Sequence, residues 1–389
     1  MRVLMVSWGW RTHFFPLVPL GWALLAAGHQ VRMAGQPSMV EPITRAGLPA
    51  VGVGTDLDFA EAFRGQLGRV GTRADRARAD VAPVVTADGG IVGHADAMVD
   101  DLIAFGEAFR PDLVVHDPYN LAAALAAARL RVPAVRQLWG ADSGTDVVVD
   151  ERVVGPRAAR LGVTADVSLT GVLTLDPCPP GMQVPLPGPS HPVRFVPYNG
   201  AAVVPPWLRE PPARDRVCVT WGTVLPDLGM VDPVGVRAVV SALAELDVEV
   251  VVVVAESLHE GLRGLPPSVR LVAAPLALHV LLPTCRLLVH QGGSGAILTA
   301  MACGVPQLAL PQVNDQHFNT ERLTAAGGGL GLSAEEATPA AIRDAAAALL
   351  GDPAWAGRAE GLRLAVQRRP SPAQVLPVLT ELAAAGVPA

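Results

Sequence analysis

The 389-residue sequence contains no lysine, so each of its 30 basic residues is an arginine. This bias is best explained by a GC-rich coding sequence, because a phosphate-binding role for every arginine is implausible. Acidic residues number 36 and the formal net charge is −6, which leaves no basic excess to bind a nucleic-acid backbone. The composition therefore argues against nucleic acid as a partner and accommodates a neutral or apolar one more easily.

Cysteine is scarce, and long apolar runs are missing. The four cysteines, Cys178, Cys218, Cys285 and Cys303, show no close metal-ligand spacing, so we expect free, mostly buried thiols in a reducing compartment. No apolar run approaches the roughly 20 residues that span a bilayer. Residues 1–7 are apolar but lack the charged leader and cleavage site of a signal peptide. These absences predict a soluble, cytoplasmic protein with no membrane partner.

Hydrophobic residues, by contrast, make up 50% of the chain and charged residues 17%. That composition supplies ample material for buried sheets, and the length predicts about two domains. In the first half, apolar runs and helical periodicity alternate. We expect strands at residues 2–7, 29–34, 49–54, 112–116, 132–138 and 193–197, and helices at 14–28, 95–109 and 121–130. Residues 55–93 and 140–171 show little periodicity, and we expect loops and short helices in the first of these stretches.

Prolines then punctuate residues 201–213, which is the composition of an interdomain linker. The alternation restarts after it. We expect strands at 216–220, 248–254, 269–273, 287–290 and 307–310, and helices at 233–246, 296–303, 339–350, 355–368 and 374–385. The pattern predicts an α/β protein of two Rossmann-like domains facing a cleft. We place the domains at 1–200 and 215–369, the linker at 201–214, and a final helical segment at 370–389.

A glycine-rich turn stands between an apolar strand and a small-residue helix in the second half. It contains His290, Gly292, Gly293, Ser294 and Gly295. Glycines let the backbone approach a ligand closely, and the N–H groups of a helix N-terminus attract anions, so the turn is a candidate phosphate site. His290, at the end of the strand, should add a side-chain donor to the same phosphates. The next strand should place Asp315 and Gln316 at the same edge of the sheet, where an acid and an amide suit sugar hydroxyls. On its own, a Gly-Gly-Ser-Gly run is more often a packing turn.

Taken together, residues 290–296 and the Asp315-Gln316 pair resemble the donor-site signature of family 1 nucleotide-sugar glycosyltransferases. The actinomycete enzymes that decorate macrolides, enediynes and other antibiotics are especially similar. This resemblance implies a GT-B fold whose last helix returns to the first domain. It also implies an inverting transfer, without metal or cofactor, from a thymidine diphosphate (TDP) deoxysugar to an apolar aglycone. A homodimer is our expectation for the assembly.

His13 is the candidate base. It lies just after the first expected strand, at the edge where such domains bind ligands, and the positive end of a helix dipole there should keep its imidazole neutral. Family members place their catalytic histidine at the matching position. Asp117 ends another expected strand and should orient His13, although capping of helix 121–130 is an alternative role for it. His116, one residue earlier, should point elsewhere.

Further residues extend the two candidate sites. Thr223 is a candidate hydroxyl donor to the phosphates, and an ordinary role in the turn between strand and helix is an equally good alternative for it. The backbone around Leu276 is a candidate for hydrogen bonds to the edge of a thymine or uracil base. Five aromatics, Trp8, Trp10, Phe14, Phe15 and Trp139, are candidates for an apolar acceptor pocket, although aromatics beside a strand are more often core.

The chain departs from the family pattern at two points. Ala296 stands where threonine or serine is common, and no tryptophan precedes Pro275-Leu276. The first change removes one phosphate hydroxyl, for which Ser294 is the candidate substitute. The second leaves base stacking, and with it the identity of the nucleotide, open.

Two other functions also stay open. A nucleotide-sugar epimerase of the same fold would turn over donor without an acceptor, and a non-catalytic helper would bind nucleotide sugar only in support of another transferase. Product formation by the purified chain alone would separate these functions.

Overall fold

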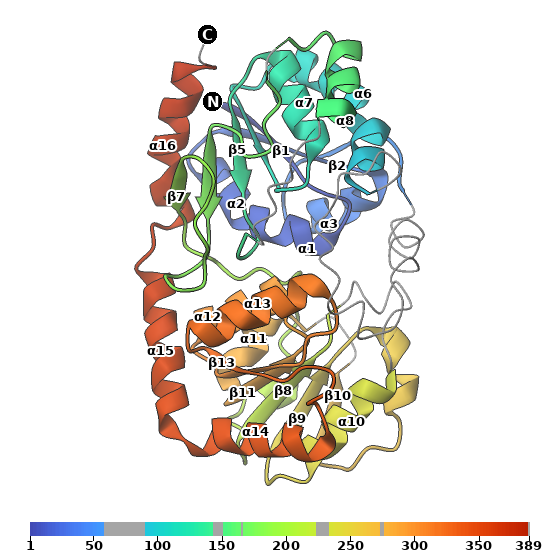
Figure 1. The fold of residues 1–389 in the computed structure, drawn as a ribbon, viewed down its shortest axis with the longest axis vertical. Coiled ribbons are helices and arrows are strands. Elements are labelled where there is room, and N and C mark those ends of the chain that lie inside the picture. The colour runs from blue at the N-terminus through green and yellow to red at the C-terminus, as the bar shows by residue number, and fades with distance from the viewer. Residues whose placement is uncertain (58–89, 143–150, 165, 223–232, 273–275, 388–389) are drawn as a thin grey trace.

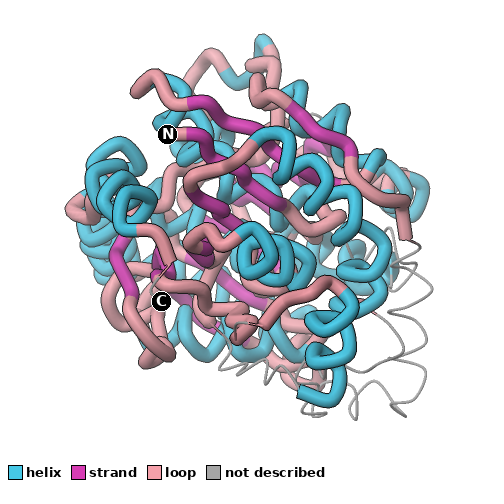
Figure 2. The backbone as a smooth tube through the Cα atoms, turned by 90° about the horizontal axis from the view of Figure 1, so that it is seen from above, coloured by secondary structure: helices cyan, strands magenta, loops and turns pink. Residues whose placement is uncertain are grey.

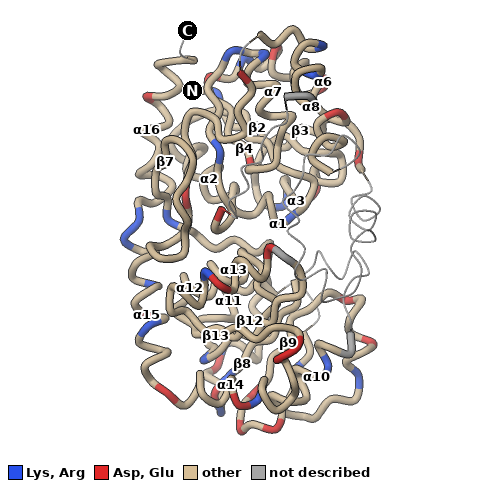
Figure 3. The backbone as a smooth tube through the Cα atoms, viewed as in Figure 1, with Lys and Arg blue, Asp and Glu red and all other residues tan. Residues whose placement is uncertain are grey.

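The computed structural model describes residues 1–57, 90–142, 151–164, 166–222, 233–272 and 276–387, and it contains two parallel β-sheets, each flanked by helices (Figure 1). The expected restart of the α/β alternation in the second half is confirmed. Figure 2 shows strands lying between layers of helix in the view from above. Arginines and acidic residues are interspersed over both described domains (Figure 3).

The first sheet has the strand order β3-β2-β1-β4-β5-β6-β7. Its strands are β1 (Arg2–Val6), β2 (Gln30–Gly35), β3 (Ala50–Gly52), β4 (Leu113–His116), β5 (Ala134–Gln137), β6 (Leu173–Asp176) and β7 (Ser190–Pro192). All pairings are parallel, and Val6 of β1 is in register with His116 of β4. The chain reverses its direction of winding between these two strands, so the loops that follow β1 and β4 border a topological switch point.

Helices cover both faces of this sheet because alternate residues of its buried strands are apolar on both sides. They are α1 (Arg11–Phe14), α2 (Val18–Ala26), α3 (Val40–Arg45), α6 (Ile91–Phe109), α7 (Leu121–Leu130) and α8 (Glu151–Arg160). On one face, Leu4 and Val6 pack with α6 and α7. On the other, Val3 and Met5 pack with α2. The two cores hold the ends of β1 and β4 in place.

The second sheet has the order β10-β9-β8-β11-β12-β13 and is also parallel throughout. Its strands are β8 (Arg216–Thr220), β9 (Glu249–Val253), β10 (Val269–Val272), β11 (Leu287–His290), β12 (Gln307–Ala309) and β13 (Gly329–Gly331). Its helices are α10 (Pro233–Ala244), α11 (Leu278–Leu281), α12 (Ser294–Cys303), α13 (Asn314–Ala325), α14 (Pro339–Gly351) and α15 (Pro353–Gln367). The switch point falls here between β8 and β11, so the two domains share one plan.

The last helix, α16 (Pro372–Ala385), lies on the first domain next to α2 (Figure 1). Val375 and Leu379 are 0% exposed and belong to the same core cluster as Leu20 and Leu24 of α2. A capping box starts the helix, in which Ser371 and Gln374 satisfy each other's backbone N–H groups. The return of the chain to its first domain confirms the expected GT-B fold.

Several expected elements differ from the structure. The helix expected at 14–28 is divided into α1, a 3-10 turn at Phe15–Leu17 and α2, with Pro16 and Pro19 at the starts of the last two. The strand expected at 193–197 is wrong, since this stretch is not part of the sheet. Its alternating buried residues imitate a strand, but Arg194 N–H donates to the carbonyl of Pro370 instead of to a neighbouring strand. Strands β6, β7 and β13 were not anticipated.

The four cysteines are free, as expected, and three of them are buried. Burial raises the pKa of the thiols of Cys178 and Cys218 well above their usual range. In the described part of the chain, no helix is both long and apolar enough to cross a membrane.

Candidate active site

The candidate base and its acid lie at the ends of neighbouring strands. His13 belongs to α1, which begins after β1, and Asp117 immediately follows β4. Nδ1 of His13 is 3.6 Å from Oδ1 of Asp117, and the two side chains are 11% and 1% exposed. This separation brings the groups together without a hydrogen bond between them. A small shift of the imidazole ring would close the contact.

Asp117 is held by the backbone of the first domain. Its Oδ2 accepts a hydrogen bond from the N–H of Trp8 at 2.6 Å, and its Oδ1 accepts one from the N–H of Tyr119 at 3.0 Å. Asn120, not Asp117, caps α7, by accepting from the N–H of Ala123 at 3.0 Å. The capping alternative is therefore wrong. The carboxylate is a fixed group facing His13.

His116 has a separate environment, as expected. It is fully buried, and its Nδ1 donates to the carbonyl oxygen of Asp117 at 2.8 Å. Burial lowers its pKa, and the nearby positive charge of Arg136 adds to that effect. We therefore regard His116 as a neutral structural residue of the sheet.

Aromatic rings surround His13. The ring centroid of Trp139 lies 4.1 Å from that of His13, and those of Trp10, Trp8 and Tyr119 lie 5.6, 6.1 and 6.1 Å away. Three of the five aromatics expected at the acceptor site therefore gather around the candidate base. Tyr119 was missed, although it lies only two residues after Asp117 in the sequence. Trp8 is 4% exposed and belongs to the core cluster that packs on α6 and α7, so it cannot line a pocket. The half-buried rings of Trp10, Tyr119 and Trp139 form a largely apolar wall beside the polar pair.

The two phenylalanines are placed differently. Phe14 is 0% exposed within the core between β1 and α2, so its ring is not available to line a pocket. Phe15 is half-buried and packs edge-on against Tyr198 at 5.3 Å. The sequence pattern could not separate these residues, because both are large, apolar and adjacent to the first strand.

Another histidine packs against this aromatic group, on Trp8. His94 of α6 is 0% exposed and stacks on Trp8 with ring centroids 4.1 Å apart. Burial lowers the pKa of His94 to about 4, so the ring is neutral near pH 7. Sequence reasoning did not single this residue out, because helical spacing gives a buried histidine no distinctive signal.

In the second domain, the glycine turn follows β11 and leads into α12. Gly292 has φ +91°, and a Cβ atom there would lie 2.8 Å from the carbonyl oxygen of Gln316. Only glycine fits that position. Gly293 precedes the first helical residue, Ser294, and no side chain caps the helix. The N–H groups of the first turn of α12, including that of Gly295, therefore lack intrahelical partners and can face an anion.

His290 is 0% exposed at the end of β11. Its Nδ1 accepts a hydrogen bond from the N–H of Gly292 at 2.9 Å, and burial lowers its pKa to about 4. Asn319 of α13 donates to the carbonyl oxygen of Gly292 at 3.2 Å. In this structure the imidazole is neutral and shapes the turn from inside the domain.

Asp315 and Gln316 occupy the first turn of α13, which follows β12. Gln316 is 5% exposed, and its Oε1 accepts from the N–H of Gln312 at 2.9 Å. Asp315 is exposed, and surrounding protein atoms raise the pKa of its carboxyl group. Contact with water moderates that rise.

The other residues expected to bind the donor, Leu276 and Thr223, contribute less to the description of the site. Leu276 is 7% exposed and its side chain belongs to a core cluster, which leaves only its backbone for a ligand. Thr223 and residues 273–275 lie outside the described residues. Among the residues that the structure describes, no group of three or more histidine, cysteine or acidic side chains could hold a metal ion.

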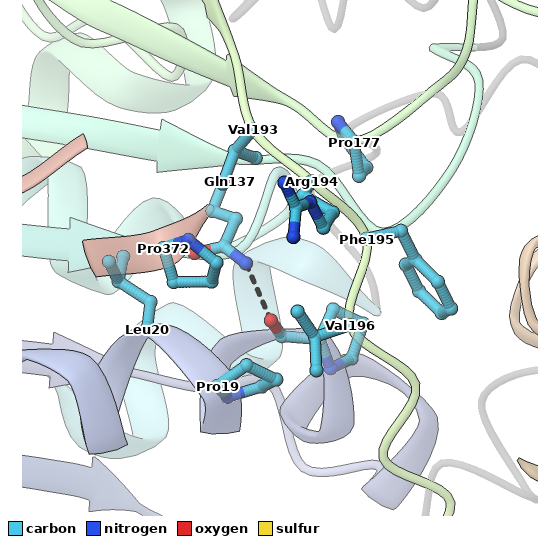
Figure 4. Close-up of a pocket in the computed structure, with 10 residues that line it drawn as sticks. Pro19, Leu20, Gln137, Pro177, Val193, Arg194, Phe195, Val196 and Pro372 are labelled. Carbon is cyan, nitrogen blue, oxygen red and sulfur yellow. Dashed lines mark hydrogen bonds between the residues drawn. The ribbon is translucent and has the colours of Figure 1, made fainter. Parts of the chain in front are cut away.

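Two hollows occur elsewhere. A cavity of about 10 Å³ lies between α2 and residues 193–196, where Gln137 donates to the carbonyl oxygen of Pro16 at 2.5 Å (Figure 4). That volume admits at most one water molecule. An open hollow of about 410 Å³ borders α13 and includes His317, Glu321 and Ser333. Neither hollow contains a residue expected to bind donor.

Two Rossmann-like domains, each with polar residues at its switch point, define the GT-B fold. The comparison with known proteins then gives the family. A family model of the erythromycin biosynthesis protein CIII-like N-terminal domain matches residues 22–222, and a model of the corresponding C-terminal domain matches residues 237–382. The chain belongs to this family of antibiotic glycosyltransferases.

Individual relatives are similar to this chain over nearly its whole length. The 10-deoxymethynolide desosaminyltransferase of Streptomyces venezuelae is 36% identical, over 99% of this chain and 97% of the relative. The crystal structure of glycosyltransferase VinC in complex with DTDP is 32% identical, with a TM-score of 0.82 over 99% of this chain and 100% of that one. Spinosyn rhamnosyltransferase SpnG, complexed with spinosyn aglycone, is 31% identical, with a TM-score of 0.81 over 98% and 100%.

Proposed function

We propose that this glycosyltransferase moves a deoxysugar from TDP to a hydroxyl group of an apolar natural-product aglycone, with inversion at the anomeric carbon. One observation carries the proposal. The His13–Asp117 pair and the glycine turn stand at the switch points of two sheets, and the segment after β5 lies against both. Trp139 packs on His13 with ring centroids 4.1 Å apart, and a Cβ atom at Gly140 would lie 2.5 Å from Oγ of Ser294. This arrangement supports a base and an anion site on either side of one reacting centre.

The chemistry of the first domain begins with proton transfer. Because Nδ1 of His13 faces Asp117, the other ring nitrogen, Nε2, is the atom that would take the acceptor hydroxyl proton. The hydroxyl oxygen then bonds to the anomeric carbon from the face opposite the diphosphate. The imidazolium that forms is stabilised by the negative charge of Asp117. A base positioned in this way typically supplies a rate factor of about 10² to 10⁴.

The second domain would stabilise the leaving group. As the bond from the anomeric carbon to the diphosphate oxygen breaks, its electron pair stays on the diphosphate. The N–H groups at the start of α12, in Gly293, Ser294 and Gly295, would donate hydrogen bonds to the negatively charged diphosphate, and the Ser294 hydroxyl would be a further donor. We infer that this helix end acts in place of a metal ion and that no cofactor is required. Asp315 and Gln316 would bind sugar hydroxyls.

His290 has a structural role in this proposal. Since its Nδ1 already accepts from Gly292 and its ring has no exposed surface, it would fix the shape of the turn instead of touching the phosphates. Thr223 stays a candidate phosphate ligand on the strength of its sequence position alone.

Two relatives support the choice of substrates. VinC was crystallised with DTDP, and SpnG with spinosyn aglycone. The ring of aromatic side chains around His13 offers an apolar surface to an acceptor of similar character. Backbone around Leu276, whose side chain is in the core, would contact the thymine base.

The test is product formation by the purified chain alone. It would be incubated with TDP-sugars and with aglycones such as 10-deoxymethynolide, and mass spectrometry would look for an aglycone heavier by one sugar. Nuclear magnetic resonance of the product would establish whether the anomeric centre is inverted. Donor turnover without any acceptor would instead favour the epimerase, and an absolute need for a second protein would favour the helper.

A further inference from the structure

A segment of the first domain lies against the helices that carry the donor site. We call residues 177–184 the strap; it follows β6. Cys178 and Met182 of the strap are 1% and 0% exposed, and they share a hydrophobic cluster with side chains of α12, α13 and α15. Arg322 of α13 donates from Nε to the carbonyl oxygen of Met182 at 3.0 Å and from Nη2 to that of Gly181 at 2.6 Å. The strap is therefore fixed to the second domain by apolar packing and by hydrogen bonds from α13.

Gln183 connects the strap back to the first domain. Its Nε2 donates to Oδ1 of Asp176 at 2.8 Å, and its Oε1 accepts from the N–H of Asp142 at 2.9 Å. Asp176 in turn pairs through Oδ2 with Arg369 at 2.7 Å, in the connection between α15 and α16. One amide side chain thus joins the end of β6, the segment after β5 and the strap.

The segment after β5, residues 139–142, touches both candidate sites. The Trp139 ring packs on His13 at 4.1 Å. At Gly140 a Cβ atom would lie 2.5 Å from Oγ of Ser294, so the glycine lets the backbone approach the first residue of α12. Asp142 is anchored from the other side by its ion pair with Arg136, at 3.0 Å. Residues 139–142 therefore contact the candidate base, the first residue of α12 and the strap.

We propose that Gln183 is a positioning residue for sugar transfer, which holds residues 139–142 in place between His13 and the donor turn. The proposal rests on the proposed function, because it assigns the two ends of this segment to acceptor and donor. Without the Gln183 amide, the N–H of Asp142 would lose this acceptor, and the Asp176 carboxylate would lose one donor while it keeps Cys178 N–H and Arg369. Residues 139–142 would then depend on the packing of Ala141 in the hydrophobic cluster that it shares with α12, α13 and α15, and would be held less tightly.

Hydrogen–deuterium exchange tests this inference with TDP as the probe, so that no acceptor is needed. In the wild type we expect saturating TDP to slow exchange at residues 139–142 by about threefold or more. In Gln183→Met most of this slowing should disappear, while the Kd for TDP, measured by calorimetry, changes by less than about threefold. Arg322→Met, on the other side of the strap, should have the same effect. The double variant should lose no more than either single variant, because both act through one path.

Thr284→Val is the matched control. It removes a partly buried hydrogen bond from Arg216, at 2.6 Å, at the amino-terminal ends of the strands of the second sheet, and it should leave the slowing intact. Slowing in Gln183→Met equal to that in the wild type would overturn the proposal. So would normal TDP binding in the wild type without any slowing at residues 139–142. Absence of TDP binding would overturn the proposed function, and this inference with it.

Discussion

Nδ1 of His13 lies 3.6 Å from Oδ1 of Asp117, and the two residues follow neighbouring parallel strands. Asp117 is fixed independently of the histidine, because it accepts hydrogen bonds from the N–H groups of Trp8 and Tyr119. The acid can therefore orient the base without itself depending on it. This asymmetry leads to distinct expectations for the two residues.

His13→Ala removes the proposed base and should lower kcat by about 10² to 10⁴. The folded state should be affected little, because the ring lies at the edge of the core and Asp117 retains its backbone partners. Steady-state kinetics with a reactive aglycone would measure the loss, and TDP binding should be unchanged. Full activity in His13→Ala would exclude a general base at this position.

Asp117→Asn should lower both activity and stability. The amide can accept from only one of the two backbone N–H groups that Asp117 binds, and leaving the other unpaired in a buried site costs about 1 to 3 kcal/mol. Urea unfolding and kinetics on the same preparation would measure the two losses. A variant that loses stability but keeps its full kcat would show that Asp117 is structural only.

The buried ion pair between Arg136 and Asp142 gives a prediction about stability. Their side chains are 4% and 6% exposed. Asp142→Ala would leave the buried guanidinium with its hydrogen bond to Thr174 but without a counter-ion, which should cost about 3 to 5 kcal/mol. Asp100→Ala, which breaks the exposed pair with Arg160, is the matched control and should cost no more than about 1 kcal/mol. Equal losses in urea unfolding would contradict the burial of the first pair.

Phe14 and Phe15 should differ in the same assay. Phe14→Ala opens a cavity in a fully buried core and should lower the free energy of unfolding by about 3 to 5 kcal/mol. Phe15→Ala removes a half-buried ring and should lower it clearly less. A larger loss for Phe15→Ala would reverse the assignment of these residues to core and surface.

The buried histidines make stability depend on pH. His94 and His290 have pKa values lowered to about 4, compared with an ordinary value near 6.5. Between these values the unfolded chain binds protons that the folded chain does not, so stability should decline as pH falls from about 6.5 towards 4. His94→Gln should flatten this decline in thermal unfolding measured across that range. An unchanged slope in the variant would contradict burial of the neutral ring.

The regular βαβ alternation could be predicted from sequence because each long strand and helix carries its own periodicity. The expected bounds of α7, β8 and β11 agree with the structure, and the glycine turn was found because its composition is local. Strands β6, β7 and β13 have three or four residues each and carry too little pattern.

The contacts around the site were harder to anticipate. The stacking of His94 on Trp8 and the hydrogen bond from the N–H of Asp142 to Gln183 join residues that are distant in sequence. Only the packing of the folded chain brings them together, so no local pattern indicates them.

The central claim is that the turn at Gly292 is the binding site for a TDP-sugar, and a thermal-shift titration with TDP and with uridine diphosphate tests it most directly. TDP at about 100 times its Kd should stabilise the wild type by about 2.7 kcal/mol. Gly292→Ala should abolish this effect, because its φ of +91° and the nearby Gln316 carbonyl exclude a Cβ atom. Gly162→Ala, with φ +65° and open space around it, controls for backbone strain and should respond like the wild type. No stabilisation of the wild type by either nucleotide would contradict the account.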